Sequence, residues 1–463
     1  MESDGGAGAA AVGVEAFGYK QELKRTLSPF DLLVYGLVFI TPTAPWATFG
    51  FVFNASHGMV PLVYIVGLVA MVFTAWSYMT MSAAFPVAGS VYAYASRGIG
   101  ENAGFLAGWA LLLDYMLLPT LVYVACAVAV NAVIPEAPKW LLVTLFLGLN
   151  TTFNLLGIES TAKVSVAMLG LQLVLLFVFM ALCVIGLAHG VGGAHLSTAP
   201  LFDAHKVTPA LIFGALSLAV LSFLGFDAIS TLTEEAKGGA RAVGMATMLS
   251  LLLAAGLFIA QTYLASLFVL GRSSFREGDE AATAFLGIAR TVGGEPMRWS
   301  VSILGVLVSG LAGALTAQAA TARLIFSMAR DGMLPRALAK VGARRQTPDR
   351  AVLLTAGVTL VLGVGLVNQL ELLASMVNFG ALTGFLALHL SVMIYFLGRQ
   401  KSRQWLRHLA SPLIGFAIIA YVLLNAQTMA KIAGLVWLGV GVAALVAVKL
   451  RGGRPGKLLE EET

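Results

Sequence analysis

The sequence predicts an all-α integral membrane protein with twelve transmembrane helices. Charged residues make up only 11% of the 463 residues, whereas soluble domains carry about 25%. Long windows without charge recur along the chain, each close to the roughly 20 residues that a helix needs to cross a bilayer. Lysine and arginine are concentrated in alternate loops. These observations exclude an ordinary soluble enzyme, a disordered chain and a nucleic-acid-binding protein.

Nine of the expected spans contain no charged residue, and three contain an isolated acid. The charge-free windows are 59–84, 140–158, 164–188, 242–271, 299–322, 351–370, 372–398, 409–430 and 432–448. The other three are about 30–55 with Asp31, 105–135 with Asp114 and 207–233 with Asp227. In lipid only helices and closed barrels satisfy the backbone, and these windows are far too long for barrel strands.

Twelve spans place both ends of the chain on one side of the membrane. Loops on that side hold 22 of the 29 Lys and Arg residues, and the opposite loops hold seven. Cytoplasmic loops are enriched in these residues, so we expect a multi-pass protein of the bacterial inner membrane with cytoplasmic termini. Residues 1–26 do not resemble a signal peptide, and we expect a mobile cytoplasmic tail there and a second tail at 450–463.

Little in the sequence indicates catalysis, a metal or a cofactor. Cys126 and Cys183 each lie inside an apolar stretch and match neither metal-ligand spacing nor a disulfide framework. The chain has no GxxxxGK[ST] motif and no HExxH motif, which argues against an ATP-driven pump and a zinc protease. An intramembrane enzyme and a channel remain as alternatives from other classes.

The first span contains two prolines near its middle. Pro42 and Pro45 each remove a backbone donor and clash with the preceding turn, and they push Thr41 and Ala44 toward extended geometry. The sequence therefore predicts a break in the helix. A simple proline kink is the alternative.

The sixth span contains Gly225 and Asp227 near its middle. Glycine tolerates non-helical geometry, and a carboxyl group at membrane depth is expected to face the protein interior or a cavity. We therefore expect a second break here. In the alternative interpretation, Asp227 is a structural acid that binds freed backbone amides.

Breaks five spans apart are typical of transporters with an inverted repeat, in which two broken helices form the substrate site near the midplane. We expect a first repeat over 27–190, a second over 206–398, and two further helices over 408–449. Half-helix ends present amides to an anionic group and carbonyls to a cation, so this architecture suits an amino acid or an amine.

Four segments resemble motifs of the amino acid–polyamine–organocation (APC) transporters. They are FPVAGSVYAYASRGIGENAGFLAGW (85–109), FLGFDAISTLTEEAKGGAR (223–241), ATARLIFSMARDGMLP (320–335) and NFGALTGF (378–385). The segments GLVFITPTAPWATFG (36–50) and LLLDYMLLP (111–119) are similar to the bacterial putrescine-importer branch. The resemblance covers nearly the whole chain.

The resemblance implies the leucine-transporter fold and a cargo of amino acids or amines. It also implies a substrate site built from spans 1, 3 and 6. Its residues would be Thr41, Thr43, Ala44, Trp46, Ala47, Tyr115, Ser222, Phe223, Gly225, Phe226 and Asp227. For the aromatic residues, plain core packing is the alternative.

Two departures from the family pattern bear on the substrate. The run from Thr41 to Pro45 offers fewer free amides than the Gly-Ser-Gly-like run of many members, which favours an amine over a carboxylate. Ala47 stands where the putrescine importers carry an acid, which argues against a dication. Amine and neutral amino acid both remain open.

A third departure concerns coupling. Some proton-coupled relatives have a lysine in span 5, and this chain has Gln172, which does not titrate. Removal from water favours the protonated form of a carboxyl group, so we expect a proton to be carried by an acid. The candidates are Asp114, Asp227, Glu234 and Glu235; for the last two, solvated residues at a helix end are the alternative.

Overall fold

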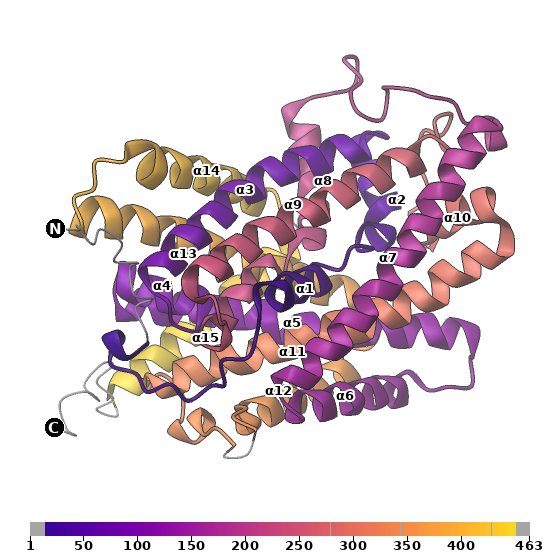
Figure 1. Cartoon of the computed structure of the whole chain (residues 1–463). Helices are drawn as coiled ribbons and strands as arrows, with labels where there is room; N and C mark the ends of the chain where they lie inside the picture. The colour runs from indigo at the N-terminus through magenta and orange to yellow at the C-terminus, as the bar shows by residue number, and fades with distance from the viewer. Residues whose placement is uncertain (1–13, 278, 343–344, 427, 451–463) are drawn as a thin grey trace, which may run out of the picture.

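The computed structural model describes residues 14–450, except 278, 343, 344 and 427. It is a bundle of helices (Figure 1). In chain order these are η1 (Val14–Phe17), α1 (Pro29–Ile40), α2 (Pro45–Ser56), α3 (Val60–Ala84), α4 (Ser90–Gly98), α5 (Glu101–Val133), α6 (Lys139–Leu155), α7 (Ile158–Ala188), η2 (Val191–Gly193), α8 (Pro209–Ala219), η3 (Val220–Phe223), η4 (Phe226–Glu235), α9 (Gly239–Ser266), α10 (Asp279–Trp299), η5 (Ser300–Gly305), α11 (Val306–Arg330), η6 (Arg336–Ala339), α12 (Asp349–Gly365), α13 (Leu370–Met393), η7 (Ile394–Arg399), η8 (Leu406–Ala410), α14 (Ser411–Leu424) and α15 (Thr428–Leu450).

Each window that was expected to span the membrane is occupied by a helix or by a broken helix. Within the described residues, eight helical segments are long and apolar enough to cross a bilayer, and nine if the bent pair α1–α2 is one span. Helices α6 and α12 have only 17 residues each. The sequence did not predict α4 or α10.

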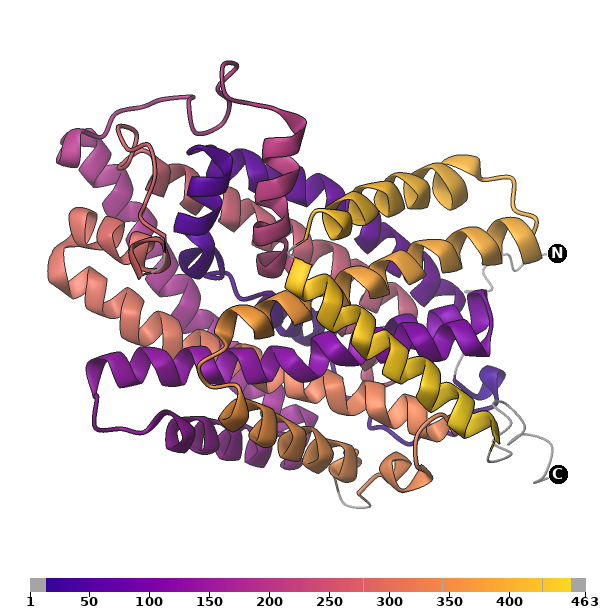
Figure 2. The same cartoon turned by 180° about the vertical axis from the view of Figure 1, so that it is seen from behind.

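Both described termini lie at one end of the bundle, which we call the terminal end. Helix η1 and the end of α15 lie there, on the left in Figure 1 and on the right in Figure 2. Helices α2 and α10 lie at the opposite end, which we call the distal end. This arrangement agrees with an even number of spans.

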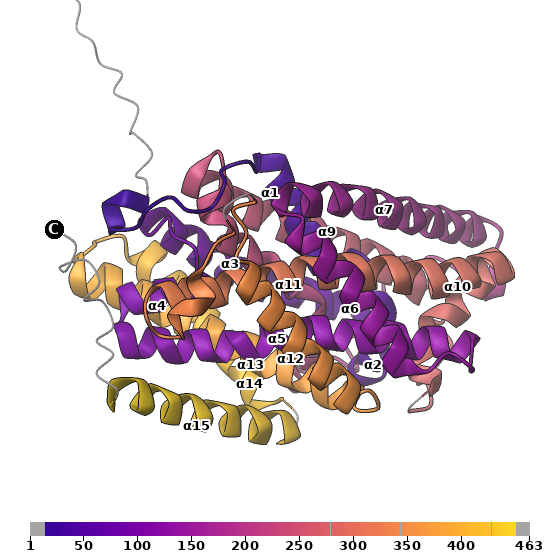
Figure 3. The ribbon, with the colours of Figure 1, turned by 90° about the horizontal axis from the view of Figure 1, so that it is seen from below.

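Helix α15 is peripheral, whereas α5 is central. In Figure 3 α15 lies at the edge of the bundle, and only 17% of its most apolar window is buried, against 72% for α5. Two tryptophans fix α15 to α5: each indole N–H of Trp109 and Trp437 donates to the other residue's carbonyl, at 2.9 and 2.7 Å. Their rings stack with centroids 4.8 Å apart.

The first break lies where the two prolines predict it. Helix α1 begins with a capping box, in which Ser28 and Asp31 satisfy each other's backbone N–H. It ends at Ile40, and Thr41 has φ 61° and ψ 98°. Helix α2 begins at Pro45 and is bent by 51° from α1. The break is therefore more than a proline kink.

The second break lies at Leu224 and Gly225. Leu224 is extended, with φ −62° and ψ 142°, and Gly225 is left-handed, with φ 114°. A β-carbon on Gly225 would lie 2.0 Å from Cδ1 of Phe39, so only glycine fits beneath that ring. The chain continues as the 3-10 helix η4, which is longer than most such helices.

The described part of the segment that was expected to form a tail over 1–26 has hydrogen-bond partners on the bundle. Residues 14–28, which we call the strap, run along the terminal end of the bundle. The amides of Thr26 and Leu27 both donate to the Glu235 carbonyl at 3.1 Å, and the Lys237 amide donates to the Leu27 carbonyl at 2.9 Å. These bonds supply partners for the exposed backbone at the end of η4. Residues 1–13 and 451–463 lie outside the described part of the chain.

Candidate functional site

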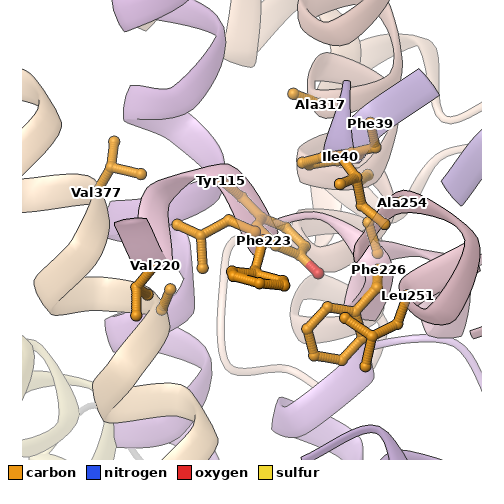
Figure 4. Packing of buried hydrophobic residues seen from close by; sticks show 14 of the residues in the cluster. Phe39, Ile40, Tyr115, Val220, Phe223, Phe226, Leu251, Ala254, Ala317 and Val377 are labelled. Atoms are coloured by element: carbon orange, nitrogen blue, oxygen red, sulfur yellow. The ribbon is translucent and has the colours of Figure 1, made fainter. Parts of the chain in front are cut away.

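The two breaks meet around one tyrosine of α5. Figure 4 shows Tyr115 among side chains of both breaks, with Phe39 from α1 and Phe223 and Phe226 from the sixth span. The rings of Phe39 and Tyr115 are 6.1 Å apart, and Phe39 also covers Gly225. The structure thus brings together residues that lie far apart in the sequence.

Asp227 is the polar centre of this region. Its Oδ2 accepts hydrogen bonds from the Tyr115 hydroxyl at 2.6 Å and, more weakly, from the Tyr78 hydroxyl at 3.4 Å. Its Oδ1 accepts from the Gly225 amide at 3.2 Å. The residue is 1% exposed, and among the described residues it forms no ion pair. Asp227 therefore binds a freed backbone amide, as the alternative interpretation held, and its hydrogen-bond donors among the described residues are neutral groups.

A cluster of hydroxyl groups joins the two broken spans beside this centre. The Tyr64 hydroxyl lies 3.0 Å from Oγ1 of Thr48 on α2 and 3.0 Å from Oγ of Ser222 on η3. Thr48 and Ser222 are 3.4 Å apart. Hydroxyl groups donate or accept as required, so this cluster connects the breaks without fixed charge.

Most of the backbone groups freed at the first break have partners. The Gln261 side chain of α9 donates to the Pro42 carbonyl at 2.8 Å. The Ala44 amide donates to the Thr41 carbonyl at 2.8 Å, and the Trp46 amide to the Thr43 carbonyl at 3.0 Å. Few amides therefore remain for an anion at this break.

The other expected residues of the first span occupy varied surroundings. Thr43 is buried, Thr41 and Ala44 are half-buried, and Ala47 is exposed. Trp46 stacks on Phe285 of α10 with ring centroids 5.2 Å apart. Trp46 thus packs toward the distal end rather than beside Asp227, and its buried indole nitrogen has no partner within the described part of the chain.

The aromatic residues of the sixth span pack in two directions. Phe223 packs against Tyr64 and Phe258, with centroids 5.8 and 5.5 Å away. Phe226 lies 5.9 Å from Tyr78 and 5.7 Å from Phe385 of α13. Both are fully buried, so they form a wall of the polar centre and belong to the core as well.

Asp114 precedes Tyr115 in the sequence, but it packs against a different helix. It lies against α13, where a β-carbon on Gly380 would be 3.2 Å from Cβ of Asp114 and 2.7 Å from its amide nitrogen. The residue is 2% exposed. Its Oδ1 has no hydrogen-bond partner among the described residues.

Glu234 and Glu235 lie at the terminal end, away from the polar centre. Both oxygens of Glu234 accept from Arg330, at 2.8 and 3.0 Å, and Oε1 also accepts from the Ala88 amide at 3.0 Å. Arg323 holds Glu235 with its Nε and Nη2. The two acids are 0% and 2% exposed, so the alternative that they are solvated is wrong.

Tyr19 of the strap completes the network at the terminal end. Its hydroxyl donates to Asp331 Oδ1 at 2.8 Å, and the Tyr92 hydroxyl donates to Oδ2 at 2.8 Å. Arg97 donates to the Tyr19 oxygen at 2.9 Å, and the Arg330 guanidinium lies 3.9 Å from the Tyr19 ring centre. Burial, followed by the Asp331 charge, raises the pKa of Tyr19, so the hydroxyl remains a donor.

Gln172, at the place of the lysine in some relatives, is 2% exposed on α7. Neither its Nε2 nor its Oε1 has a hydrogen-bond partner among the described residues. The structure thus encloses a polar, neutral side chain at this place.

Sequence reasoning missed several polar residues around the two breaks, namely Thr48, Tyr64, Tyr78 and Gln261. Tyr64 and Gln261 stand inside spans 2 and 7 as polar groups in apolar windows. Polar residues in a membrane helix usually face the interior, so this signal was available. Their partners depend on tertiary packing.

Comparison with known proteins identifies the family. Residues 32–447 match the amino acid permease family. The low-affinity putrescine importer PlaP of Escherichia coli K12 is 32% identical over 92% of this chain and 94% of its own length. The branched-chain amino acid permease BcaP of Bacillus subtilis is 26% identical, over 91% and 92%. The methylthioribose transporter of the same organism is 26% identical, over 81% and 82%. The APC resemblance is thereby confirmed, and the chain belongs to the amino acid permease family, whose members are transporters rather than enzymes.

Proposed function

We propose that the protein is a secondary transporter that imports a small amine or amino acid by alternating access, coupled to protons. The observation that carries the proposal is Asp227, a buried carboxyl group between the two breaks that only hydroxyl and amide groups compensate. An ammonium group is the natural partner for such a charge, because charge-assisted hydrogen bonds are about twice as strong as neutral ones.

The first break favours an amine over a carboxylate. Pro42 and Pro45 have no N–H to donate, and the amides of Ala44 and Trp46 already bond within the break. A substrate carboxylate would find few donors there. The similarity to a putrescine importer supports an amine, whereas the similarity to a branched-chain amino acid permease keeps a neutral amino acid as the second candidate.

Ala47 bears on whether the amine carries one charge or two. The Ala47 side chain is exposed in this arrangement. With alanine there, a second ammonium group lacks a carboxylate partner. We therefore propose preference for a substrate with one amine, and a putrescine or polyamine importer is the alternative.

The wider organisation belongs to the same proposal. We propose twelve spans in the leucine-transporter fold, with inverted repeats over 27–190 and 206–398, two further helices over 408–449, and both termini in the cytoplasm. The two breaks, five spans apart, and the basic loops support it. Reporter fusions at successive loops test the topology: a phosphatase active only outside must alternate with a cytoplasmic reporter through twelve spans.

Substrate binding is tested on the purified full-length protein. A thermal-shift screen of amines and amino acids should reveal a stabilising compound, because a ligand of the folded state raises the melting temperature. Labelled putrescine and labelled leucine are then followed in proteoliposomes preloaded with the same unlabelled compound. We expect counterflow, which a carrier shows and a channel does not.

Ala47→Asp tests the number of charges. We expect the variant to shift competition toward putrescine, with Ala47→Asn as the control of equal size. Strong putrescine binding by the wild type that Ala47→Asp leaves unchanged contradicts the single-amine proposal and supports the polyamine alternative.

Coupling is tested with gradients in the same vesicles. An inward proton gradient should drive accumulation and a protonophore should abolish it, without sodium. Accumulation driven by sodium alone, or uptake that depends only on an internal counter-substrate, would replace proton symport with sodium coupling or exchange.

A further inference from the structure

The four candidate acids differ in which groups lie beside their carboxyl oxygens, and this difference indicates which of them can carry the coupled proton. Arg330 and Arg323 bind both oxygens of Glu234 and of Glu235. A guanidinium group remains charged at any physiological pH, and an adjacent positive charge favours the carboxylate. Each glutamate is therefore held by an arginine in a buried two-point ion pair, and separating such a pair is costly.

Asp227 has donors for its charge. Two hydroxyl groups and one backbone amide donate to its two oxygens. Hydrogen bonds to the charged form favour that form. Of the two acids without an arginine, Asp227 is thus the better prepared to remain ionised.

Asp114 has the opposite surroundings. It is as deeply buried, at 2% exposed, its Oδ1 lacks a hydrogen-bond partner, and among the described residues it forms no ion pair. An uncompensated carboxylate in a protein interior is strongly unfavourable, and such a group usually takes up a proton instead.

Among the residues that the structure describes, no positively charged side chain acts on Asp114. On α5 the next residue is Tyr115. Asp227 and Tyr78, which contact each other, both lie close enough to interact electrostatically with Asp114. On α13 the backbone of Gly380 lies close to Asp114, and Thr383, one turn later on the same face, has a hydroxyl that no described residue partners. Two carboxylates in one buried region repel each other, which disfavours ionisation of both. Asp227 is favoured as the ionised one because it has hydrogen-bond donors.

We propose that Asp114 carries the coupled proton, while Asp227 remains ionised to receive the cationic group of the substrate; this rests on the proposed proton-coupled import. The arrangement in which α5 and α13 enclose Asp114 is compatible with its neutral form. A proton from the outside medium binds the Asp114 carboxylate before closure. When water reaches the group from the inside, the O–H bond breaks, the proton passes to that water, and the carboxylate is restored.

Infrared difference spectra of the purified full-length protein test the protonation directly. The C=O stretching band of a protonated carboxyl group is separate from the bands of ionised carboxylates. At neutral pH we expect such a band in the wild type, its loss in Asp114→Asn, and its retention in Asp227→Asn. Loss of the band in Asp227→Asn with retention in Asp114→Asn overturns the assignment.

Transport supplies the second readout, with labelled putrescine and labelled leucine as the probes. An inward proton gradient of about one pH unit can sustain roughly tenfold accumulation for each coupled proton. Asp114→Asn imitates the neutral form, so we expect counterflow at the wild-type rate and loss of that accumulation. Asp114→Glu, which restores a titratable group, should recover the response. Glu101→Gln, at the exposed start of α5, is the matched control and should behave as wild type.

The outcomes separate the two proposals. If the wild type responds to the gradient and Asp114→Asn responds equally, the role of Asp114 is refuted and proton symport stands. If Asp114→Asn loses counterflow as well although its melting temperature is unchanged, Asp114 contacts the substrate instead and the proposal is refuted. If the wild type ignores the gradient with both probes, proton coupling itself fails, and the role of Asp114 with it.

Discussion

The terminal end and the polar centre of this protein hold buried acids in opposite ways. At the terminal end each glutamate is bound by an arginine from α11, and the strap supplies further hydrogen bonds. At the centre, counting only the part of the chain that the structure describes, Asp227 has hydroxyl and amide donors alone, and Asp114 Oδ1 has no donor. Both regions are buried, so exposure does not distinguish them.

The difference indicates which of the two regions can bind and release a cation. A buried ion pair with fixed partners is strongly destabilised when one partner is lost, so the terminal end is suited to holding elements together. A carboxyl group that has only neutral donors is not occupied by a fixed cation, so it can bind a cationic substrate reversibly. Four variants test this contrast.

The largest effect is expected from Arg323→Met. The substitution leaves Glu235 buried and unpaired, which costs about 3–5 kcal/mol of folding stability, because both residues are 3% exposed or less. Thermal unfolding in detergent measures it. Lys24→Met, which removes the partner of Glu159 in a pair whose side chains are 54% and 55% exposed, should change stability little. Equal losses in the two variants would contradict the contrast between buried and surface pairs.

Asp227→Asn should leave the protein folded and slow its transport. Loss of a charged hydrogen bond to substrate is worth about 1.5–3 kcal/mol, which is roughly 10- to 150-fold in uptake below saturation. Labelled uptake is measured beside the amount of protein in the membrane. Wild-type uptake in this variant would show that the charge at the centre has no part in transport.

Gly225→Ala tests how tightly the second break is built. The new β-carbon meets the Phe39 ring at a left-handed φ of 114°, so we expect about 1–3 kcal/mol of destabilisation. Gly239→Ala is the matched control, since its φ is 58° and nothing lies within 4 Å of the added carbon. A similar loss at both glycines would assign the effect to backbone strain alone, without the Phe39 contact.

The smallest effect is expected from Tyr19→Phe. It removes a hydrogen bond to Asp331, worth about 1 kcal/mol, and should increase hydrogen exchange in residues 14–28 without changing substrate affinity. Glu22→Gln, an exposed strap residue, should leave exchange unchanged. A change in substrate affinity with Tyr19→Phe would mean that the two regions are not independent.

The sequence predicted the breaks because their causes are local. Pro42 and Pro45 lack amide hydrogens, and Gly225 accepts a left-handed conformation, so each break follows from a residue type at its own position. Asp227 also stood out, as a carboxyl group in an apolar window. The meeting of Tyr115 with Asp227 was expected only in outline, from the resemblance to a family.

The partners of the remaining acids could not be predicted, since they come from distant segments. Glu234 and Glu235 look like a solvated helix end in the sequence, but Arg330 and Arg323 lie 96 and 88 residues later in the chain. The strap looks like a tail because it is rich in charged residues, and several of its partners are backbone groups at and just after the end of η4, which no side-chain pattern reveals. Only folding brings these groups together.

The strap also has a consequence for biosynthesis. Tyr19 and Asp331 are 312 residues apart, so at about 5–20 residues per second the second residue is made roughly 15–60 seconds after the first. Throughout that interval the strap has left the ribosome without Asp331 or the two arginines. The strap is thus synthesised early, but its contact with Asp331 can form only after eight of the expected spans have been synthesised. The terminal end is therefore completed late in the folding of the protein.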